Sequence, residues 1–375
     1  KYSQWGAYAY VGYDFDGYAG ISAAARFDKT GRFESDPTFF PAVDAYVDFK
    51  RLLLADNKAV SSLKIIGGYG EAGRETVLPY EFLANYIANV PEVETGTELY
   101  FDGINRLISK EYNVGFNIGF MNDRFNNRLG FDFSWYKSNA TRQLINLPMD
   151  NLSGYEKRKV NAGNIENKGF EIDVDFRIIQ HRNVVWTLYA NASFNTNSVA
   201  SLHELDRRTP GLTNGKYTAV SQAYGRKSDK RGEVASADLD ILGNTLPEYA
   251  GGLGTTLRLY GLTVDARFSA AGGFNIINAN KLVEKGRDYI SSDDLEKGDY
   301  LRLDCLCFSY DIPVRAKWIK DFKVNLAVRN LFTISGYSGW NPDVNSFGVT
   351  VRGNGVDYGS FPLIRSVALG VSLKF

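Results

Sequence analysis

The chain ends in a segment in which apolar and polar residues alternate without a break. Residues 364–375 read I-R-S-V-A-L-G-V-S-L-K-F, so every second position from Val367 to Phe375 is apolar. A period of two places these side chains on one face of a β-strand and the intervening ones on the other. Such a strand fits a soluble sheet with one buried face, or a transmembrane barrel with a lipid-facing side and a wet lumen. The number and the connections of similar strands separate these interpretations.

The same alternation recurs along the chain and predicts an all-β, antiparallel fold. The 23 Tyr, 24 Phe and 37 Gly residues are typical of strands and turns rather than helices. One helical turn is expected within residues 51–61. We predict thirteen strands, at residues 2–14, 18–27, 39–49, 63–70, 107–120, 128–137, 165–178, 185–197, 249–259, 262–271, 300–312, 322–332 and 364–375.

The connections between these strands alternate, with few exceptions, between short and long. Tight turns such as Phe15-Asp16-Gly17 and Tyr260-Gly261 alternate with loops such as 71–103, 198–247 and 333–362. Short turns at one rim and long loops at the other are typical of outer-membrane barrels, whereas β-sandwiches have Greek-key connections. We therefore expect a transmembrane β-barrel in the outer membrane. A soluble all-β protein that binds glycans is the alternative.

The two faces of the predicted strands differ in chemistry. One face carries the apolar residues Leu129, Phe131, Phe133, Trp135, Phe170, Ile172, Val174, Phe176, Trp186, Leu188, Ala190, Phe194, Leu306, Phe308 and Tyr310. A wet lumen suits the charged side chains of the other face. The candidate lumen-facing residues are Asp132, Glu171, Asp173, Asp175, Asp265, Arg267, Lys323 and Arg329.

The parity of the strand count adds a further expectation. Bacterial single-chain barrels have an even number of strands and begin and end at the rim with short turns. Here the predicted count is odd, and the first strand runs from the long-loop rim toward a short turn. We therefore expect residues 1–375 to form the carboxyl-terminal portion of a larger barrel.

Several other classes of function find no support in the sequence. Lys and Arg number 43, as do Asp and Glu, so no basic excess points to nucleic acid. The sequence contains no apolar run of about 18 residues, so no membrane-spanning helix is predicted.

The residues that are able to bind a metal or to act as catalysts also give no candidate site. His181 and His203 have no partner at metal-ligand spacing. Cys305 and Cys307 are expected to be two free thiols on the lumen side of one strand. The carboxylates at 171, 173 and 175 spread along a strand and line a wall instead of converging on a metal or an acid catalyst, so neither an enzyme nor a cofactor is expected.

Seven different short motifs follow one another along nearly the whole chain. They are Ala25-Arg26-Phe27-Asp28 with Gly31 and Phe33; Phe40-Pro41 with Ala45-Tyr46; Leu63-Lys64 with Gly68-Tyr69-Gly70 and Gly73; Asn164-Ile165-Glu166-Asn167-Lys168-Gly169-Phe170-Glu171; Gly298-Asp299-Tyr300-Leu301-Arg302-Leu303; Asn330-Leu331-Phe332-Thr333 with Tyr337, Gly339 and Asn341-Pro342; and Gly355-Val356-Asp357 through to Phe375.

This set resembles the SusC/RagA family of TonB-dependent outer-membrane transporters of Bacteroidetes. One departure is Arg74, where the family's third motif ends in Asn. The resemblance implies a 22-stranded barrel around an amino-terminal plug, with the plug and the TonB box lying outside these residues. It also implies a SusD/RagB-like surface lipoprotein as a lid, and energy from the TonB–ExbB–ExbD complex acting through the missing amino-terminal part.

The resemblance implies import of oligomeric nutrients, with oligosaccharides as the first cargo and oligopeptides as the second. The alternative function is a passive porin or an adhesive surface barrel. Aromatic side chains in the long loops are able to stack on sugar rings or on peptide side chains, or to touch the lid, although packing inside the loops explains them equally well. These candidates are Tyr217, Tyr224, Tyr337 and Trp340.

Overall fold

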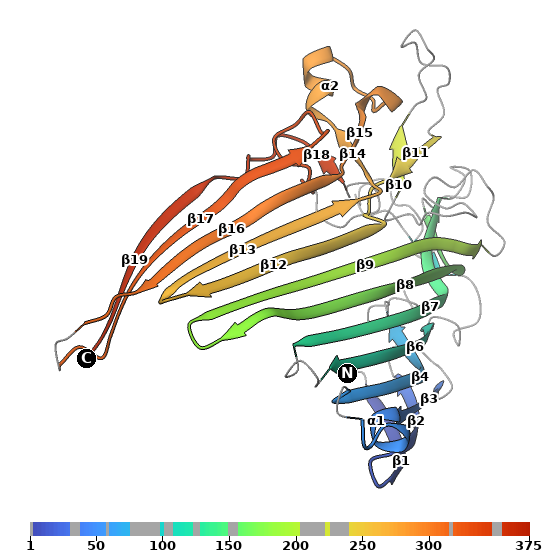
Figure 1. The fold of residues 1–375 in the computed structure, drawn as a ribbon. Coiled ribbons are helices and arrows are strands. Elements are labelled where there is room, and N and C mark those ends of the chain that lie inside the picture. The colour runs from blue at the N-terminus through green and yellow to red at the C-terminus, as the bar shows by residue number, and fades with distance from the viewer. Residues whose placement is uncertain are drawn as a thin grey trace.

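The computed structural model describes most of the chain. The described residues are 3–30, 38–57, 60–75, 98–100, 108–122, 128–148, 157–202, 222–225, 240–314, 318–346 and 355–375. Most of them lie in one curved antiparallel sheet, with a smaller unit standing beyond the strand ends on one side (Figure 1). None of the helices in this described part has the length and apolarity needed to span a bilayer.

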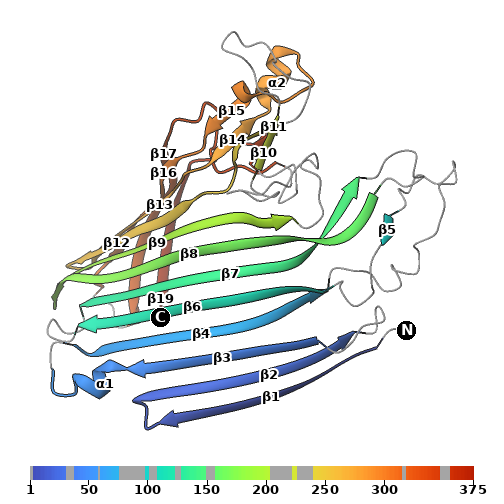
Figure 2. The same cartoon turned by 90° about the vertical axis from the view of Figure 1, so that its right-hand side faces the viewer.

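The large sheet follows the order of the sequence, each strand hydrogen-bonded to the next (Figure 2). Its strands are β1 (Gln4–Phe15), β2 (Ala19–Thr30), β3 (Thr38–Asp48), β4 (Ser62–Glu75), β6 (Ile108–Asn122), β7 (Leu129–Pro148), β8 (Lys157–His181), β9 (Val184–Leu202), β12 (Tyr249–Leu259), β13 (Leu262–Gly272), β16 (Tyr300–Asp311), β17 (Asp321–Ser335) and β19 (Ser366–Lys374). A short strand, β5 (Glu98–Tyr100), pairs in parallel with β8. The thirteen predicted strands are confirmed, and β1 and β19 form the two ends of the path.

Some strands are longer than the sequence pattern predicts. The alternation predicted strands at 128–137 and 165–178, but β7 continues to Pro148 and β8 begins at Lys157. These extensions pair with each other, with Leu147 opposite Arg158 and Asn146 opposite Lys159. Backbone pairing does not require an apolar face, and side-chain alternation reports only the part of a strand that has one. The pattern therefore marked the amphipathic band rather than the strand ends.

The register confirms that the two sets of side chains lie on opposite faces of the sheet. Phe170 lies opposite Phe194, and Phe194 lies opposite Tyr249, while their neighbours Glu171 and Ser193 face each other on the other side. We call the side with Phe170 the apolar face and the side with Glu171 the polar face. Directly opposed residues share a face, so the assignment carries across every paired strand.

Within the described residues, no second layer covers the apolar face of β19. Val367 is 71% exposed, Leu369 74% and Val371 62%. A soluble sheet would bury such a row against another layer, because large contiguous apolar patches are rare on soluble monomers. In the described chain, the only clusters of fully buried apolar residues lie in the smaller unit, around Ile276 and Ile277. The exposed row is therefore an observation that favours a membrane barrel over a sandwich.

Aromatic side chains border the apolar face at both of its ends. Toward the long loops, the rings of Phe133, Phe170, Phe194 and Tyr249 form a row with successive centroids 6.1, 4.6 and 6.3 Å apart. Near the carboxyl terminus, Trp318 stacks on Phe375 at 5.8 Å with an interplanar angle of 4°. Aromatic belts at both ends of an apolar band are typical of barrels that cross a membrane.

Gly169 of β8 occupies a position where a side chain has no room. A Cβ atom there would lie 2.2 Å from the Phe194 carbonyl oxygen and 2.7 Å from the Tyr136 hydroxyl. We expect Gly169→Ala to destabilise the folded protein by about 1–3 kcal/mol, because the backbone oxygen cannot rotate away. The measurement is the denaturant midpoint of the refolded protein in detergent.

Gly130 of β7 is the matched control for this substitution. A Cβ atom at Gly130 would meet Cβ of Asp175 at 3.7 Å, an ordinary contact. Gly130→Ala is therefore expected to leave the midpoint within about 0.5 kcal/mol of the parent value. Equal losses of stability for the two variants would contradict the steric explanation.

Short helices and strands complete the fold. The predicted helical turn is α1 (Phe49–Leu53), which the side chain of Asp48 caps by accepting a hydrogen bond from the Arg51 amide at 3.0 Å. The loops predicted between the long strands contain β10 (Gln222–Gly225), β11 (Asp240–Asn244), β14 (Asn275–Asn278), α2 (Asn280–Lys285), η4 (Ser292–Asp294), β15 (Leu295–Lys297) and β18 (Val356–Asp357). The prediction of plain loops over these residues was wrong, because strands of two to five residues are too short to show a period.

The β14, β15 and β18 strands with α2 and η4 form a compact body that we call the rim unit. It stands beyond the ends of β13, β16 and β17, on the side of the long connections (Figure 1). β14 pairs antiparallel with β15 and parallel with β18, which comes from the last loop of the chain. The rim unit therefore ties two long loops together at one end of the barrel wall.

Candidate functional site

Four carboxylates gather on the polar face of β7 and β8. Asp132 lies directly opposite Asp173, with Glu171 and Asp175 one step away on either side, and all four side chains are exposed. Like charges directly opposed across two strands destabilise a sheet, so this arrangement is not explained by stability. We call these four residues the acidic wall.

The polar face of β13, β16 and β17 carries charges of both signs. Asp265 accepts hydrogen bonds from Arg267 at 2.8 Å and from the Thr256 hydroxyl at 2.8 Å. Lys323 pairs with Asp311 at 3.0 Å. Arg329 lies opposite Cys305, which in turn lies opposite Arg267. This half of the face therefore presents exposed guanidinium groups beside satisfied carboxylates.

The two cysteines lie on the polar face of β16, as the sequence predicted. Cys305 and Cys307 are opposite Arg267 and Asp265, and their sulfur atoms are 2.6 Å apart. Both are free thiols. Within the described ranges, no group of three or more His, Cys, Asp or Glu residues is placed to hold a metal ion.

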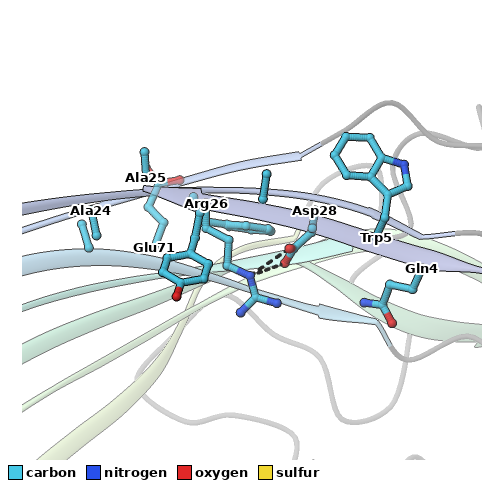
Figure 3. A pocket seen from close by; sticks show the side chains of 12 residues that line it. Gln4, Trp5, Ala24, Ala25, Arg26, Asp28 and Glu71 are labelled. Carbon is cyan, nitrogen blue, oxygen red and sulfur yellow. Dashed lines mark hydrogen bonds and ion pairs between the residues drawn. The ribbon is translucent and has the colours of Figure 1, made fainter. Parts of the chain in front are cut away.

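A cavity of about 720 Å³ lies at the end of β1 to β4 nearest the long loops. Figure 3 shows Arg26 and Asp28 projecting from β2 into it, joined by an ion pair of 2.8 Å. Gln4, Trp5 and Glu71 also line it. The Arg26 side chain is 63% exposed, so its guanidinium meets solvent as well as Asp28. Arg26 and Asp28 belong to the first of the seven motifs found in the sequence, Ala25-Arg26-Phe27-Asp28.

In the rim unit, motif residues hold the loops together through buried polar contacts. Tyr337 donates its hydroxyl to Asp357 at 2.7 Å, and Asp357 is 1% exposed. Arg302, which is 6% exposed, donates to the Asn341 side-chain oxygen at 2.9 Å. Burial first, and then the hydrogen bond to Asp357, raise the pKa of Tyr337 well above its usual value. The motifs around 298–303, 337–342 and 355–357 therefore contribute buried polar contacts to this rim.

The carboxylate of Glu296 is surrounded by four donors in the rim unit. It accepts from Lys281 at 2.8 Å, from the Asn278 amide at 2.9 Å, and from the Ser338 backbone and hydroxyl at 2.8 and 2.7 Å. Burial on its own would raise the pKa of Glu296, but these donors outweigh it and lower the pKa to about 2. Glu296 thus links β15 to β14 and to the loop after β17.

This pKa predicts that the rim unit loosens in acid. A carboxylate whose pKa is lowered by folding stabilises the folded state above its unfolded pKa, and this contribution is lost as the pH falls. Here the loss is expected between pH 4.5 and about 2. Hydrogen exchange of the Ser338 amide should accelerate through that window. In Glu296→Gln, exchange should be fast at neutral pH and insensitive to pH over the same window after correction for intrinsic rates. An unchanged acid profile in the variant would contradict the assignment.

The predicted loop aromatics have different surroundings. Tyr337 is 7% exposed and packs in the core of the rim unit, as expected if this aromatic residue packs inside the loops instead of contacting cargo or the lid. Trp340 of the same loop is 78% exposed. Tyr224 lies in β10, opposite Ile241. Tyr217 lies outside the described residues. Sequence reasoning missed Asp294, Glu296, Arg302 and Asp357, for which only the motif matches at 302 and 357 gave a signal.

Comparison with known proteins gives one result at the level of families. The family model described as "TonB dependent receptor-like, beta-barrel" matches residues 1–331. TonB-dependent receptor P3 of Formosa agariphila is 24% identical over 97% of this chain and 45% of its own length. TonB-dependent receptor SusC of Bacteroides thetaiotaomicron is 22% identical over 93% of this chain and 41% of its own length. The chain thus spans somewhat less than half of these relatives.

Solved structures share the fold. A structure described as the RagAB peptide transporter has a TM-score of 0.77 at 20% identity, over 98% of this chain and 47% of the other. The RagAB peptide importer in a "closed-closed" state gives a TM-score of 0.73 at 21% identity, with 100% and 48% covered. In its fold, the chain therefore matches about half of each of these solved structures.

Proposed function

The chain belongs to the TonB-dependent receptor-like β-barrel family of the outer membrane, and from this membership we propose that it forms the carboxyl-terminal wall of an importer of oligomeric nutrients. The observation that carries the proposal is the family match over 1–331, together with an amphipathic sheet whose apolar row is uncovered. Further strands and a plug, supplied by sequence outside residues 1–375, would close the barrel between β1 and β19.

The two faces of the sheet then have separate roles. The apolar face with its aromatic borders contacts lipid, and the polar face lines the lumen. The acidic wall, Arg267, Lys323 and Arg329 are lumen-facing in this arrangement. Because outer-membrane barrels have short periplasmic turns and long extracellular loops, the rim unit stands on the cell surface and the carboxyl terminus lies at the periplasmic side.

The cargo that we propose first is an oligosaccharide. Support comes from the resemblance of the motifs to the SusC/RagA family and from exposed ring faces such as that of Trp340, on which sugars are able to stack. The acidic wall gives specific support to a second candidate, an oligopeptide. Asp132 and Asp173 face each other without a cation between them in the register, so a cationic side chain or amino terminus of a peptide would relieve their repulsion.

The partners are proposed on the same basis. A SusD/RagB-like lipoprotein would close the barrel from outside, with the rim unit as the rigid part of the wall beneath it. The TonB–ExbB–ExbD complex would supply energy through the amino-terminal part of the whole protein. A passive porin or an adhesive barrel would need neither partner.

Uptake by cells that carry the whole transporter tests the proposal. Uptake of the oligomeric cargo should stop when the proton gradient is dissipated and when the lid lipoprotein is deleted. A porin would continue to admit cargo under both conditions, and an adhesin would not import it at all. Either outcome would overturn energised import.

Cargo class is tested on the purified whole transporter. If the cargo is a peptide, Asp132→Asn with Asp173→Asn should weaken binding of lysine-containing oligopeptides by about tenfold, since a lost charge-assisted contact is worth about 1.4 kcal/mol. Neutral oligosaccharides should bind equally to both forms. The matched control is Asp321→Asn, an exposed aspartate at the opposite end of the sheet wall.

A further inference from the structure

A small cavity opens on the apolar face of the sheet, where its side chains change from aromatic to charged. Its volume is about 300 Å³, and it lies among Trp135, Lys168, Phe170, Phe194 and Tyr249. The Phe170 and Phe194 rings stack side by side with centroids 4.6 Å apart, and Tyr249 extends the row. The floor of the cavity is therefore aromatic, and one wall carries an ammonium group.

That ammonium group belongs to a cluster of three charges just beyond the aromatic row. Lys137 lies opposite Lys168 in the register, on the same face as the opposed pair Trp135 and Phe170. Glu166 accepts from Lys137 at 2.7 Å and from Lys168 at 3.1 Å. Within this cluster, two lysines against one glutamate leave an excess of one positive charge, and Glu248 adds a carboxylate elsewhere in the cavity lining. Lys168 is the more exposed lysine, at 54%, so the excess charge is directed to the outside of the sheet.

We infer that this cavity binds the anionic phosphate headgroup of an outer-leaflet membrane lipid. The phosphate would sit against Lys168, and an acyl chain would lie over the Phe170 and Phe194 rings. The excess positive charge of the cluster favours an anion beside Lys168, and the uncovered aromatic floor favours a molecule with an apolar part. Phosphate is the anionic group of most membrane lipids. Free phosphate has no apolar part that would pack against the aromatic floor. The inference rests on the proposed contact of the apolar face with lipid.

Two residues of the cluster make a test with opposite signs. Lys168→Gln removes the excess charge, so half-saturation should need about tenfold more anionic lipid. Glu166→Gln frees both lysines from their common carboxylate, so half-saturation should need about threefold to tenfold less lipid. A purely structural ion-pair cluster would be weakened by both changes and would show no opposite shifts. Lys285→Gln, an exposed lysine in α2, is the control and should change nothing.

Trp135 supplies the readout, because it lines the cavity. The whole transporter is reconstituted in phosphatidylcholine bilayers that contain increasing fractions of phosphatidylglycerol with brominated acyl chains, which quench indole fluorescence by contact. The quenching component that disappears in Trp135→Phe should saturate at a low fraction of the anionic lipid. Its midpoint should then move in opposite directions in Lys168→Gln and Glu166→Gln.

Each other outcome overturns the inference. Equal quenching by brominated phosphatidylcholine would mean ordinary lipid contact without headgroup selection. Displacement by inorganic phosphate would mean a site for free anions. If Trp135 were not quenched at all, the apolar face would not contact lipid. The membrane arrangement on which the proposed function rests would then be wrong as well. Cargo uptake does not enter this measurement, so a failure of the headgroup site leaves the transport proposal intact.

Discussion

Val328→Lys is expected to destabilise the folded barrel by about 2–4 kcal/mol, the loss typical of a lysine at the lipid-facing midplane of a membrane barrel. Val328 lies on the apolar face of β17, between Leu306 of β16 and Val367 of β19. It is near the centre of the apolar row, between the Trp318–Phe375 stack and the end of β17 at Ser335. Its two directly opposed neighbours, Leu306 and Val367, offer an ammonium group no polar partner.

The adjacent residue Ala327 provides the matched control. It lies on the polar face, between Cys307 and Ala368, at the same height in the same strand. Ala327→Lys is expected to change the unfolding free energy by less than about 1 kcal/mol, because its ammonium group stays in water. Both free energies are measured by reversible unfolding of the whole protein in lipid vesicles. Equal losses at 327 and 328 would contradict the assignment of the two faces.

Asp294→Ala is expected to cost the rim unit about 3–5 kcal/mol of local stability, because it removes one partner of a buried ion pair. Asp294 has no exposed surface. Its carboxylate accepts from Arg287 at 2.5 Å and from the Ser291 amide and hydroxyl at 2.8 and 3.1 Å. Without it, a largely buried guanidinium and a buried backbone amide lose their acceptor. The loop from α2 to β15 should then open far more often.

Hydrogen exchange across residues 279–299 measures this opening, and exchange in the long strands should stay unchanged. Asp288→Ala is the control, since it removes the same charge from an exposed residue of the same loop. We expect it to alter exchange by less than about 0.5 kcal/mol. Similar acceleration in both variants would mean that net charge, rather than the buried pair, holds the loop. Loss of the long strands in Asp294→Ala would mean that the rim unit is not a separate cooperative unit.

The alternation of side chains determined the larger part of the fold. A period of two is a local property of the chain, so the thirteen strands, their order and the two faces followed from residues such as Val367 to Phe375 and Phe170 to Phe176. The pairing of neighbours also followed, because strands joined by short turns pair with each other. The motif set gave the family in the same way, since it needs no contacts in space.

The tertiary structure decided what depends on contacts between distant segments. The parallel pairing of β14 with β18 joins residues 277 and 356, and strands this short have no period that a sequence can display. Glu296, Asp294 and Asp357 are surface-like residue types in loops, and only their burial against Lys281, Arg287 and Tyr337 shows that they hold the rim. The cluster of Lys137, Lys168 and Glu166 also needed the register, because Lys137 and Glu166 are neighbours only through the pairing of β7 with β8. Local periodicity therefore determines the strands and their faces. Buried polar networks depend on contacts between residues far apart in the sequence and are seen only in the folded structure.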